Sequence, residues 1–353
     1  MTLPSPRRVL DLIEAFRKSK TMFAAVALGV FDRLPADCPA LAEALGAQPD
    51  AIERLLDACV GLGFLRKDEG VYRNLPVAET YLRRSGPHSL VSYILYSNNA
   101  LFRLWANLED ALREGTPRWE QTFGVPGALF SQFFRTDQAM RDFIAGMHGY
   151  GLLSSPAVVA AFDLSRFRTL VDLGGATGHL AIAACERYSG LRAVVLELPR
   201  VLEVAREYVA GSRVELVAGD FFTDPLPEAD LFAVGRILHD WPEDKIRVLL
   251  RKIFERLPVG GALLIAERLL DDDRTGPLSV QLQSLNMLVC TEGKERTLAE
   301  YAALLREAGF RDIQGRKTGA PLDAILAFRA ELRSAPAQNK GARNPGWLHY
   351  FIR

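Results

Sequence analysis

Val171-Asp-Leu-Gly-Gly-Ala-Thr-Gly-His179 decides the fold class, because a glycine-rich turn here joins a short apolar run to a helical stretch. Glycine has no Cβ, so such a turn lets the backbone approach a ligand closely. A nicotinamide dinucleotide turn has the spacing Gly-x-Gly-x-x-Gly, but Gly174 and Gly175 are adjacent and His179 occupies the last glycine position. The segment predicts a strand-to-helix turn that holds a ligand other than a dinucleotide; taken alone, it also fits an ordinary turn.

Outward from this turn, short apolar runs alternate with helical stretches. The expected strands cover residues 168–173, 191–198, 214–218, 231–235 and 262–267, with helices such as 181–188 and 244–257 between them. This alternation is typical of a parallel sheet with helices on both faces. Ligands of such sheets bind beyond the carboxyl ends of the strands. The side chains that follow the strands are therefore the candidate site residues.

One acidic residue ends the second expected strand and another follows the third. Glu197 lies roughly 20 residues past the turn, where an acid commonly binds ribose hydroxyls. In Asp220-Phe-Phe222, the carboxylate could accept a hydrogen bond from the amine of an adenine, and an aromatic ring could stack on the adenine ring. Either acid alone is more often a helix cap or a surface charge. Together with the turn, they predict an adenosine cofactor without a pyrophosphate, such as S-adenosyl-L-methionine.

A histidine follows the fourth expected strand, in Gly235-Arg-Ile-Leu-His-Asp-Trp241. Neutral imidazole, with an unperturbed pKa of ~6.5, can take a proton from a hydroxyl near neutral pH. A lone histidine is usually structural, but the position of His239 beyond a central strand favours a general base. Glu267, which ends the fifth strand, is expected to hold the imidazole tautomer. Asp240 is expected to point elsewhere.

Residues 1–90 predict a winged-helix outline, with short helices at 41–46 and 51–62 and a hairpin over 64–74. Winged helices often bind DNA through a recognition helix with several polar or basic side chains. The second helix here is mostly apolar and carries one arginine against two acids. Packing or dimerisation is therefore the favoured role.

Three further segments complete the expected organisation. Residues 91–165 are predicted to be helical and rich in aromatic side chains, which serve as core or as the wall of an apolar substrate site. Residues 166–330 form the expected α/β domain that binds the cofactor. Residues 331–353 have a linker-like composition and are expected to be a poorly ordered tail.

The composition argues against several other classes of function. The 353 residues carry 43 basic and 43 acidic side chains, so no basic excess favours nucleic-acid binding. The four cysteines and five histidines are scattered, which predicts neither a disulfide framework nor a metal site. The first apolar run, 22–31, is shorter than the ~20 residues that span a bilayer. We expect a cytoplasmic protein that binds neither membranes nor nucleic acid.

With these residues assembled, eight segments carry a family resemblance. They are Gln121–Pro126, Ala161–Ser165, Val171–Gly178, Gly219–Leu231, Arg236–Trp241, Ser284–Val289, Thr291–Thr297 and Thr318–Ala327. They resemble the class I small-molecule O-methyltransferases that use S-adenosyl-L-methionine, and among them the acetylserotonin (hydroxyindole) O-methyltransferases. This family pairs a winged-helix dimerisation domain with a Rossmann-like domain built on a seven-stranded, mostly parallel sheet. The resemblance spans roughly residues 8–328.

The resemblance also implies roles for individual residues. The implied cofactor contacts are Gly174, Glu197, Asp220, Phe221 and Arg236. His239 matches the general base, flanked by Glu267 and Glu295, while Asn286 and Cys290 match substrate positions. The family implies methylation of a small aromatic hydroxyl compound. It also implies a homodimer in which each protomer helps to close the pocket of its neighbour.

Four positions depart from the family pattern. Ala176 replaces a common glycine, which is a mild change if its φ is negative, and Glu197 stands where many relatives have aspartate. Phe134 falls where relatives often have a tyrosine near the cofactor. Cys290 stands where the acetylserotonin enzymes have a glutamine, and a thiol lacks the strong donor and acceptor of an amide. This last departure leaves aromatic O-methylation intact but leaves the acceptor open.

Three alternatives to a hydroxyindole methyltransferase therefore stay open. The first is an O-methyltransferase for another phenolic or polyketide natural product. The second is a relative whose chemistry has changed to hydroxylation or decarboxylation, although His239 with two flanking acids argues against it. The third is a non-catalytic protein that binds the cofactor.

Overall fold

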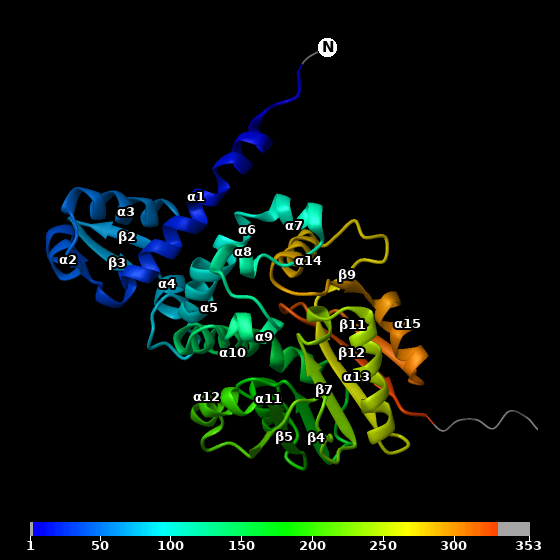
Figure 1. The fold of residues 1–353 in the computed structure, drawn as a ribbon. Coiled ribbons are helices and arrows are strands. Elements are labelled where there is room, and N and C mark those ends of the chain that lie inside the picture. Colours follow the sequence, from blue (N-terminus) through cyan, green and yellow to red (C-terminus); the bar gives the residue numbers. More distant parts are fainter. Residues whose placement is uncertain (1–2, 331–353) are drawn as a thin grey trace, which may run out of the picture.

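A seven-stranded sheet forms the centre of the second half of the chain in the computed structural model, which describes residues 3–330 (Figure 1). Its strands are β4 (Thr169–Leu173), β5 (Arg192–Glu197), β6 (Val214–Ala218), β7 (Leu231–Gly235), β8 (Ala262–Glu267), β11 (Arg311–Arg316) and β12 (Asp323–Phe328). They lie in the order β11-β12-β8-β7-β4-β5-β6, and only β12 runs against the common direction. The expected mostly parallel sheet is confirmed, and its five predicted strands match β4 to β8 within one residue at each end.

Helices cover both faces of this sheet, as the alternating pattern predicts. The elements are α10 (Asp137–Ala160), α11 (His179–Arg187), α12 (Pro199–Val209), α13 (Glu243–Arg256), α14 (Leu278–Cys290) and α15 (Leu298–Ala308), with the short strands β9 (Leu269–Leu270) and β10 (Arg296–Thr297). Successive strand residues point into two apolar clusters. Leu170 and Val195 join the cluster that includes α11 and the end of α10. Val171 and Leu196 join the cluster that includes α12, α13 and α15.

The order of the strands fixes the position of the ligand site. β4 pairs with β5 on one side and with β7 on the other. In an open parallel sheet, a crevice forms beyond the carboxyl ends of the strands where the strand order reverses in this way. The glycine turn follows β4 and the His239 segment follows β7, so the fold brings these two segments to the same edge.

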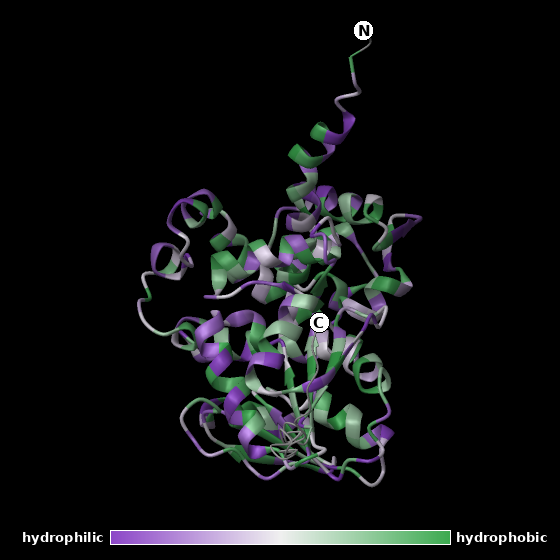
Figure 2. Ribbon diagram, turned by 90° about the vertical axis from the view of Figure 1, so that its right-hand side faces the viewer, coloured by the Kyte–Doolittle hydropathy of each residue, from purple (hydrophilic) through white to green (hydrophobic). Residues whose placement is uncertain are grey.

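The N-terminal part has its own apolar core, which includes Phe31, Leu56 and Tyr72. Its elements are α1 (Arg7–Leu28), η1 (Phe31–Arg33), β1 (Ala36–Asp37), α2 (Cys38–Leu45), α3 (Pro49–Gly61), β2 (Leu65–Asp68), β3 (Val71–Asn74) and α4 (Pro76–Tyr81). The turn between β2 and β3 has positive φ at Glu69 and Gly70, as a tight hairpin of twisted strands requires. The structure thus contains the two predicted helices and the hairpin of the winged-helix outline. The N-terminal half of α1 projects away from the rest of the molecule (Figures 1 and 2), whereas Ala25 and Val26 near its other end are buried in the N-terminal core.

A layer of helices lies between this part and the sheet domain (Figure 1). It consists of α5 (Val91–Tyr96), η2 (Ser97–Leu101), α6 (Phe102–Trp105), α7 (Leu108–Glu114), α8 (Trp119–Phe123), α9 (Leu129–Phe133) and the first half of α10. The helical character predicted for 91–165 is therefore present. The boundaries predicted near residues 90 and 165 stay predictions, because Val91 and Ile94 of α5 pack in the N-terminal core. The predicted tail, 331–353, lies outside the described residues.

Helix α10 connects the helical layer to the sheet domain. Gly146 and Gly149 face α5 and the residues before it: a Cβ on Gly146 would lie 3.0 Å from the Cα of Tyr93, and one on Gly149 would lie 2.7 Å from the carbonyl oxygen of Ser89. Only glycine allows this close approach. Within residues 3–330, α10 is also the one helix long and apolar enough to cross a membrane, but half of that stretch is buried, as in the core helix of a globular protein. The cytoplasmic location stays a prediction.

Candidate active site

A cavity of about 330 Å³ lies at the carboxyl ends of the parallel strands, between the sheet and the helical layer. Eight of the ten predicted site residues line it, namely Gly174, Glu197, Asp220, Phe221, Arg236, His239, Asn286 and Cys290. The other two, Glu267 and Glu295, lie behind His239 and are almost fully buried. The opposite wall comes from the helical layer, with the aromatic side chains Tyr93, Tyr96, Phe130, Phe133, Phe134 and Phe143.

The glycine turn after β4 forms the floor of the cavity. A Cβ on Gly174 would lie 2.7 Å from Ile237, and one on Gly175 would lie 2.5 Å from the carboxylate of Asp172, so neither position accepts a side chain. Ala176 has a φ of +50°. The condition for a mild change, a negative φ, is therefore not met: alanine is strained here, where glycine would not be.

Glu197 ends β5 directly beside this turn. Its Oε2 accepts the N–H of Ala176 at 3.1 Å, and its Oε1 accepts the N–H of Leu198 at 2.7 Å. Burial raises the pKa of Glu197 to about 7. Each oxygen keeps further acceptor capacity, so the carboxyl group can receive the two vicinal hydroxyls of a ribose.

Asp172 is a site residue that the sequence argument missed. It is 1% exposed and lines the cavity, and neither of its carboxyl oxygens has a hydrogen-bond partner among the described residues. Burial, with the nearby carboxylate of Glu197, raises the pKa of Asp172 to about 8. A buried carboxyl without a partner is costly, so this group is suited to a donor or cation brought by a ligand. The residue stands in the quoted motif, but its isolation is visible only in three dimensions.

The loop after β6 carries Asp220 and Phe221 and is held from outside by Lys252 of α13. The ammonium group of Lys252 donates to the carbonyl oxygens of Phe221 at 2.8 Å, Phe222 at 3.1 Å and Asp224 at 2.5 Å. The loop therefore has a fixed backbone shape. It presents an acid and adjacent aromatic rings to the cavity, which suits the amine and the flat face of an adenine. No motif in the sequence indicates Lys252.

Arg236 follows β7 with a φ of +58°. Its guanidinium lies 4.8 Å from the ring centre of Tyr150, and Nη1 donates to the sulfur of Met147 at 3.0 Å. A non-glycine residue with positive φ is uncommon and often marks a functional site. The strained backbone here directs a cation into the cavity, where it can meet an anionic group of a ligand.

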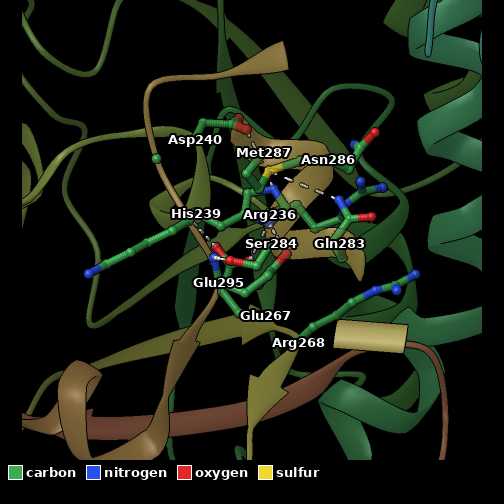
Figure 3. Close-up of polar contacts among 12 residues, drawn as sticks. Arg236, His239, Asp240, Glu267, Arg268, Gln283, Ser284, Asn286, Met287 and Glu295 are labelled. Carbon is green, nitrogen blue, oxygen red and sulfur yellow. Dashed lines mark hydrogen bonds and ion pairs between the residues drawn. The ribbon is translucent and has the colours of Figure 1, made fainter. Parts of the chain in front are cut away.

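Glu267 and Glu295 lie close together beside His239 (Figure 3), and neither lines the cavity. The Oε1 atom of Glu295 lies 2.8 Å from Nδ1 of His239, whereas Oε2 of Glu267 lies 3.4 Å from the same nitrogen. Oε1 of Glu267 instead accepts the backbone N–H groups of Ile237, Leu238 and His239, at 3.1, 2.9 and 3.3 Å. The expected orienter, Glu267, thus shapes the backbone of this segment, and Glu295 makes the shorter contact to the imidazole.

Asp240 lies on the other side of the imidazole. Its Oδ1 is 3.5 Å from Nε2 of His239, and its side chain lines the cavity. The expectation that Asp240 points elsewhere is therefore wrong. The two residues share a single turn of 3₁₀ helix, η3 (Leu238–Asp240), so two consecutive side chains reach the same space.

The carboxyl groups change the charge of His239. Burial lowers the pKa of its imidazole, but the carboxylates of Glu267, Glu295 and Asp240 outweigh this effect and raise the pKa to about 9. One ligand atom from each of His239, Glu267 and Glu295 lies within 4.8 Å of the others, a spacing that a metal ion could use. The 2.8 Å contact between Nδ1 and Glu295 is already that of a hydrogen bond, which accounts for the grouping, and we assign no metal to it.

Asn286 and Cys290 lie one turn apart on α14 and face the cavity beyond His239. The indole N–H of Trp105 donates to Oδ1 of Asn286 at 2.8 Å. The amide nitrogen of Asn286 lies 3.5 Å from Sγ of Cys290, and the thiol donates to the carbonyl oxygen of Asn286 at 2.9 Å. The sequence places both residues in the site but gives no sign of their contact with Trp105.

Comparisons with known proteins agree with this geometry. Residues 105–311 match the model of the O-methyltransferase domain, and residues 10–84 match that of the O-methyltransferase dimerisation domain. The chain is 43% identical to the acetylserotonin O-methyltransferase of Bos taurus over 330 residues, which covers 90% of this chain and 96% of the relative.

Two solved structures extend the likeness to three dimensions. Human N-acetylserotonin methyltransferase in complex with S-adenosylmethionine has a TM-score of 0.90 at 41% identity, over 93% of this chain and 99% of that one. A mitomycin 7-O-methyltransferase has a TM-score of 0.81 at 29% identity, over 92% and 97% of the two chains. The chain therefore belongs to the O-methyltransferase family, and it is an O-methyltransferase that uses S-adenosyl-L-methionine.

Proposed function

We propose that this enzyme methylates a hydroxyl group of a small aromatic acceptor of the hydroxyindole class, with His239 as the general base. The observation that carries the proposal is the placement of His239, whose Nδ1 is held by Glu295 while Nε2 lies beside Asp240 at the cavity. The acceptor class is supported by the relative from Bos taurus, an acetylserotonin O-methyltransferase. It is also supported by the aromatic wall of the cavity.

The residues of the cavity fit the cofactor. Gly174 lines the cavity, and a Cβ there would press on Ile237 and Phe221, which line it too. Glu197 suits the ribose hydroxyls, and the Asp220–Phe222 loop suits the adenine. Arg236 and the unpartnered Asp172 supply a cation and a carboxyl group for the charged groups of its amino-acid part. When bound, the cofactor supplies a methyl group on a positively charged sulfur, so the reaction needs no metal to activate the donor.

The chain itself handles the proton of the acceptor. Methyl transfer to the hydroxyl oxygen requires that oxygen to lose its proton, and Nε2 of His239 would take it. Glu295 stabilises the resulting imidazolium through Nδ1. The aromatic wall of the cavity would hold the acceptor in line, and such positioning can lower a barrier by about several kcal/mol.

A second acceptor class, another phenolic natural product, is supported by two observations. One is the likeness to a mitomycin 7-O-methyltransferase. The other is the small thiol of Cys290 in the cavity wall, since a thiol forms only weak hydrogen bonds with a polar arm of a substrate. A panel of hydroxyindoles and other phenols, assayed with labelled cofactor, separates the two classes.

Replacing His239 tests the general base. His239→Ala should reduce methylation of 5-hydroxyindole by at least about 100-fold, because general-base catalysis is typically worth that much. Cofactor affinity, measured by calorimetry, should stay close to that of the parent enzyme. His88→Ala, an exposed histidine on the N-terminal part, is the matched control and should keep full activity. Full turnover by His239→Ala with normal cofactor binding would contradict the assignment.

Replacing Glu267 should affect mainly stability, and replacing Glu295 should affect mainly catalysis. Glu267→Ala leaves three buried backbone N–H groups without their acceptor and should lower the free energy of unfolding by about 2 kcal/mol. Glu295→Ala removes the contact to Nδ1, so it should mainly lower kcat. Urea denaturation and steady-state kinetics of both variants give the comparison. Equal loss of stability in the two would show that Glu267 has no special role in the backbone.

The pH profile tests the electrostatics. His239 must be neutral to accept a proton, and its carboxylate neighbours raise its pKa to about 9, so kcat/KM for the acceptor should rise with pH. Glu295→Gln removes one negative charge, lowers the pKa of His239 and should move the rising limb to lower pH, together with a lower maximum. Glu307→Gln, in an exposed pair with Arg247, should leave the profile unchanged. A shift of the Glu295→Gln limb to higher pH would reject the assignment.

We further propose that the enzyme is a homodimer joined through α1, which belongs largely to the matched dimerisation domain. Val9, Ile13 and Phe16 follow a helical spacing along one side of α1, and each is more than half exposed. Light scattering should give a dimer, and Ile13→Asp should weaken it. Val248→Asp, at an equally exposed valine on α13, should not. A monomer for the parent chain across micromolar concentrations would exclude this interface.

A further inference from the structure

The amide of Asn286 has a defined orientation in the cavity wall. Its oxygen and nitrogen could exchange places by a half turn of the side chain, and neighbours must decide between the two. The indole N–H of Trp105 is a donor only, and it lies 2.8 Å from Oδ1. The oxygen must therefore face Trp105, and the NH₂ group must take the other side.

That other side leads to Cys290 and the cavity. The amide nitrogen lies 3.5 Å from Sγ of Cys290, which can accept one of its two hydrogens weakly. The thiol hydrogen is itself used by the carbonyl oxygen of Asn286. Among the described residues, no acceptor is recorded for the second amide hydrogen, while Asn286 lines the cavity. This stretch of the wall therefore offers a hydrogen-bond donor to a bound molecule.

Trp105 stands outside the cavity and comes from another layer of the fold. It ends α6 in the helical layer, packs against the main apolar cluster and is not a lining residue. The same layer fixes the end of α14 a second time, since the indole N–H of Trp119 donates to the backbone carbonyl of Cys290 at 2.8 Å. The two tryptophans differ in what they hold: Trp119 holds backbone, whereas Trp105 sets the direction of a side chain that faces the cavity.

We propose that Trp105 is a positioning residue for specificity. By fixing the amide of Asn286, it makes this part of the wall a hydrogen-bond donor. The enzyme thereby selects substrates that carry, besides the reacting hydroxyl, an oxygen that accepts a hydrogen bond, such as a carbonyl oxygen. The proposal rests on the proposed function, because it concerns the acceptor of that reaction. A substrate with an apolar group next to Asn286 leaves a buried amide hydrogen of Asn286 without a hydrogen-bond partner, which is costly.

Pairs of hydroxylated substrates that differ only in whether they carry the carbonyl oxygen test the proposal. One pair is 3-acetyl- and 3-isopropenyl-5-hydroxyindole, and a second is 4′-hydroxyacetophenone and 4-isopropenylphenol; in each, a carbonyl oxygen is replaced by a methylene of similar shape. With the parent enzyme, kcat/KM should favour the carbonyl member of at least one pair by on the order of tenfold. In Trp105→Phe, the amide can turn, so this ratio should fall by a similar factor; the difference in phenol acidity within each pair is the same for both enzymes and does not affect this change.

Two further variants separate positioning from general damage to the fold. Asn286→Asp keeps the acceptor for Trp105 but removes the amide hydrogens, so it should also abolish the preference. Trp119→Phe loses an indole N–H of the same kind and should lower the melting temperature while keeping the preference. A preference that survives in both Trp105→Phe and Asn286→Asp, or that is absent from the parent enzyme, overturns the proposal.

Binding distinguishes failure of this inference from failure of the proposed function. Each pair is also titrated by calorimetry into the enzyme saturated with S-adenosylhomocysteine, where no reaction occurs. A binding preference for the carbonyl member without methylation of either would contradict the proposed reaction but support the role of Trp105. Methylation of both members with equal affinities, or no binding of either pair, would overturn the role of Trp105.

Discussion

The carboxylate of Glu267 is the contact on which the arrangement of the site depends. It ends a fully buried strand, β8, and accepts three consecutive backbone N–H groups from the segment that follows the neighbouring strand, β7. A single anion thereby folds that segment into a tight turn. The turn brings both His239 and Asp240 to the cavity, where a looser connection would allow one of them to leave it.

The strands and most of the site were predictable because both follow from topology. Buried parallel strands are short apolar runs, and their carboxyl ends meet at one edge of the sheet. Residues at or just beyond the ends of different strands, such as Glu197, Asp220 and His239, therefore had to converge on one cavity. No distance between them was needed for this conclusion, only the order of strands and helices.

The directions of side chains were not predictable in the same way. Which of the two flanking glutamates, Glu267 or Glu295, makes the closer contact to the imidazole depends on a difference of less than 1 Å. The positive φ of Ala176 is a property of the closed turn rather than of alanine. The contact of Trp105 with Asn286 joins residues 181 positions apart, and no local pattern in the chain encodes a contact between such distant segments.

The glycines of α10 have a mechanical consequence. Because Gly146 and Gly149 let the helix lie against the backbone around α5, α10 meets the N-terminal part at two points of direct backbone contact, with aromatic pairs such as Tyr93–Tyr150 and Tyr96–Phe143 beside them. Such contacts leave little room for sliding or bending. Helix α10 and the N-terminal part should therefore move as one rigid piece during turnover, and a side chain introduced at either glycine would act as a wedge between them.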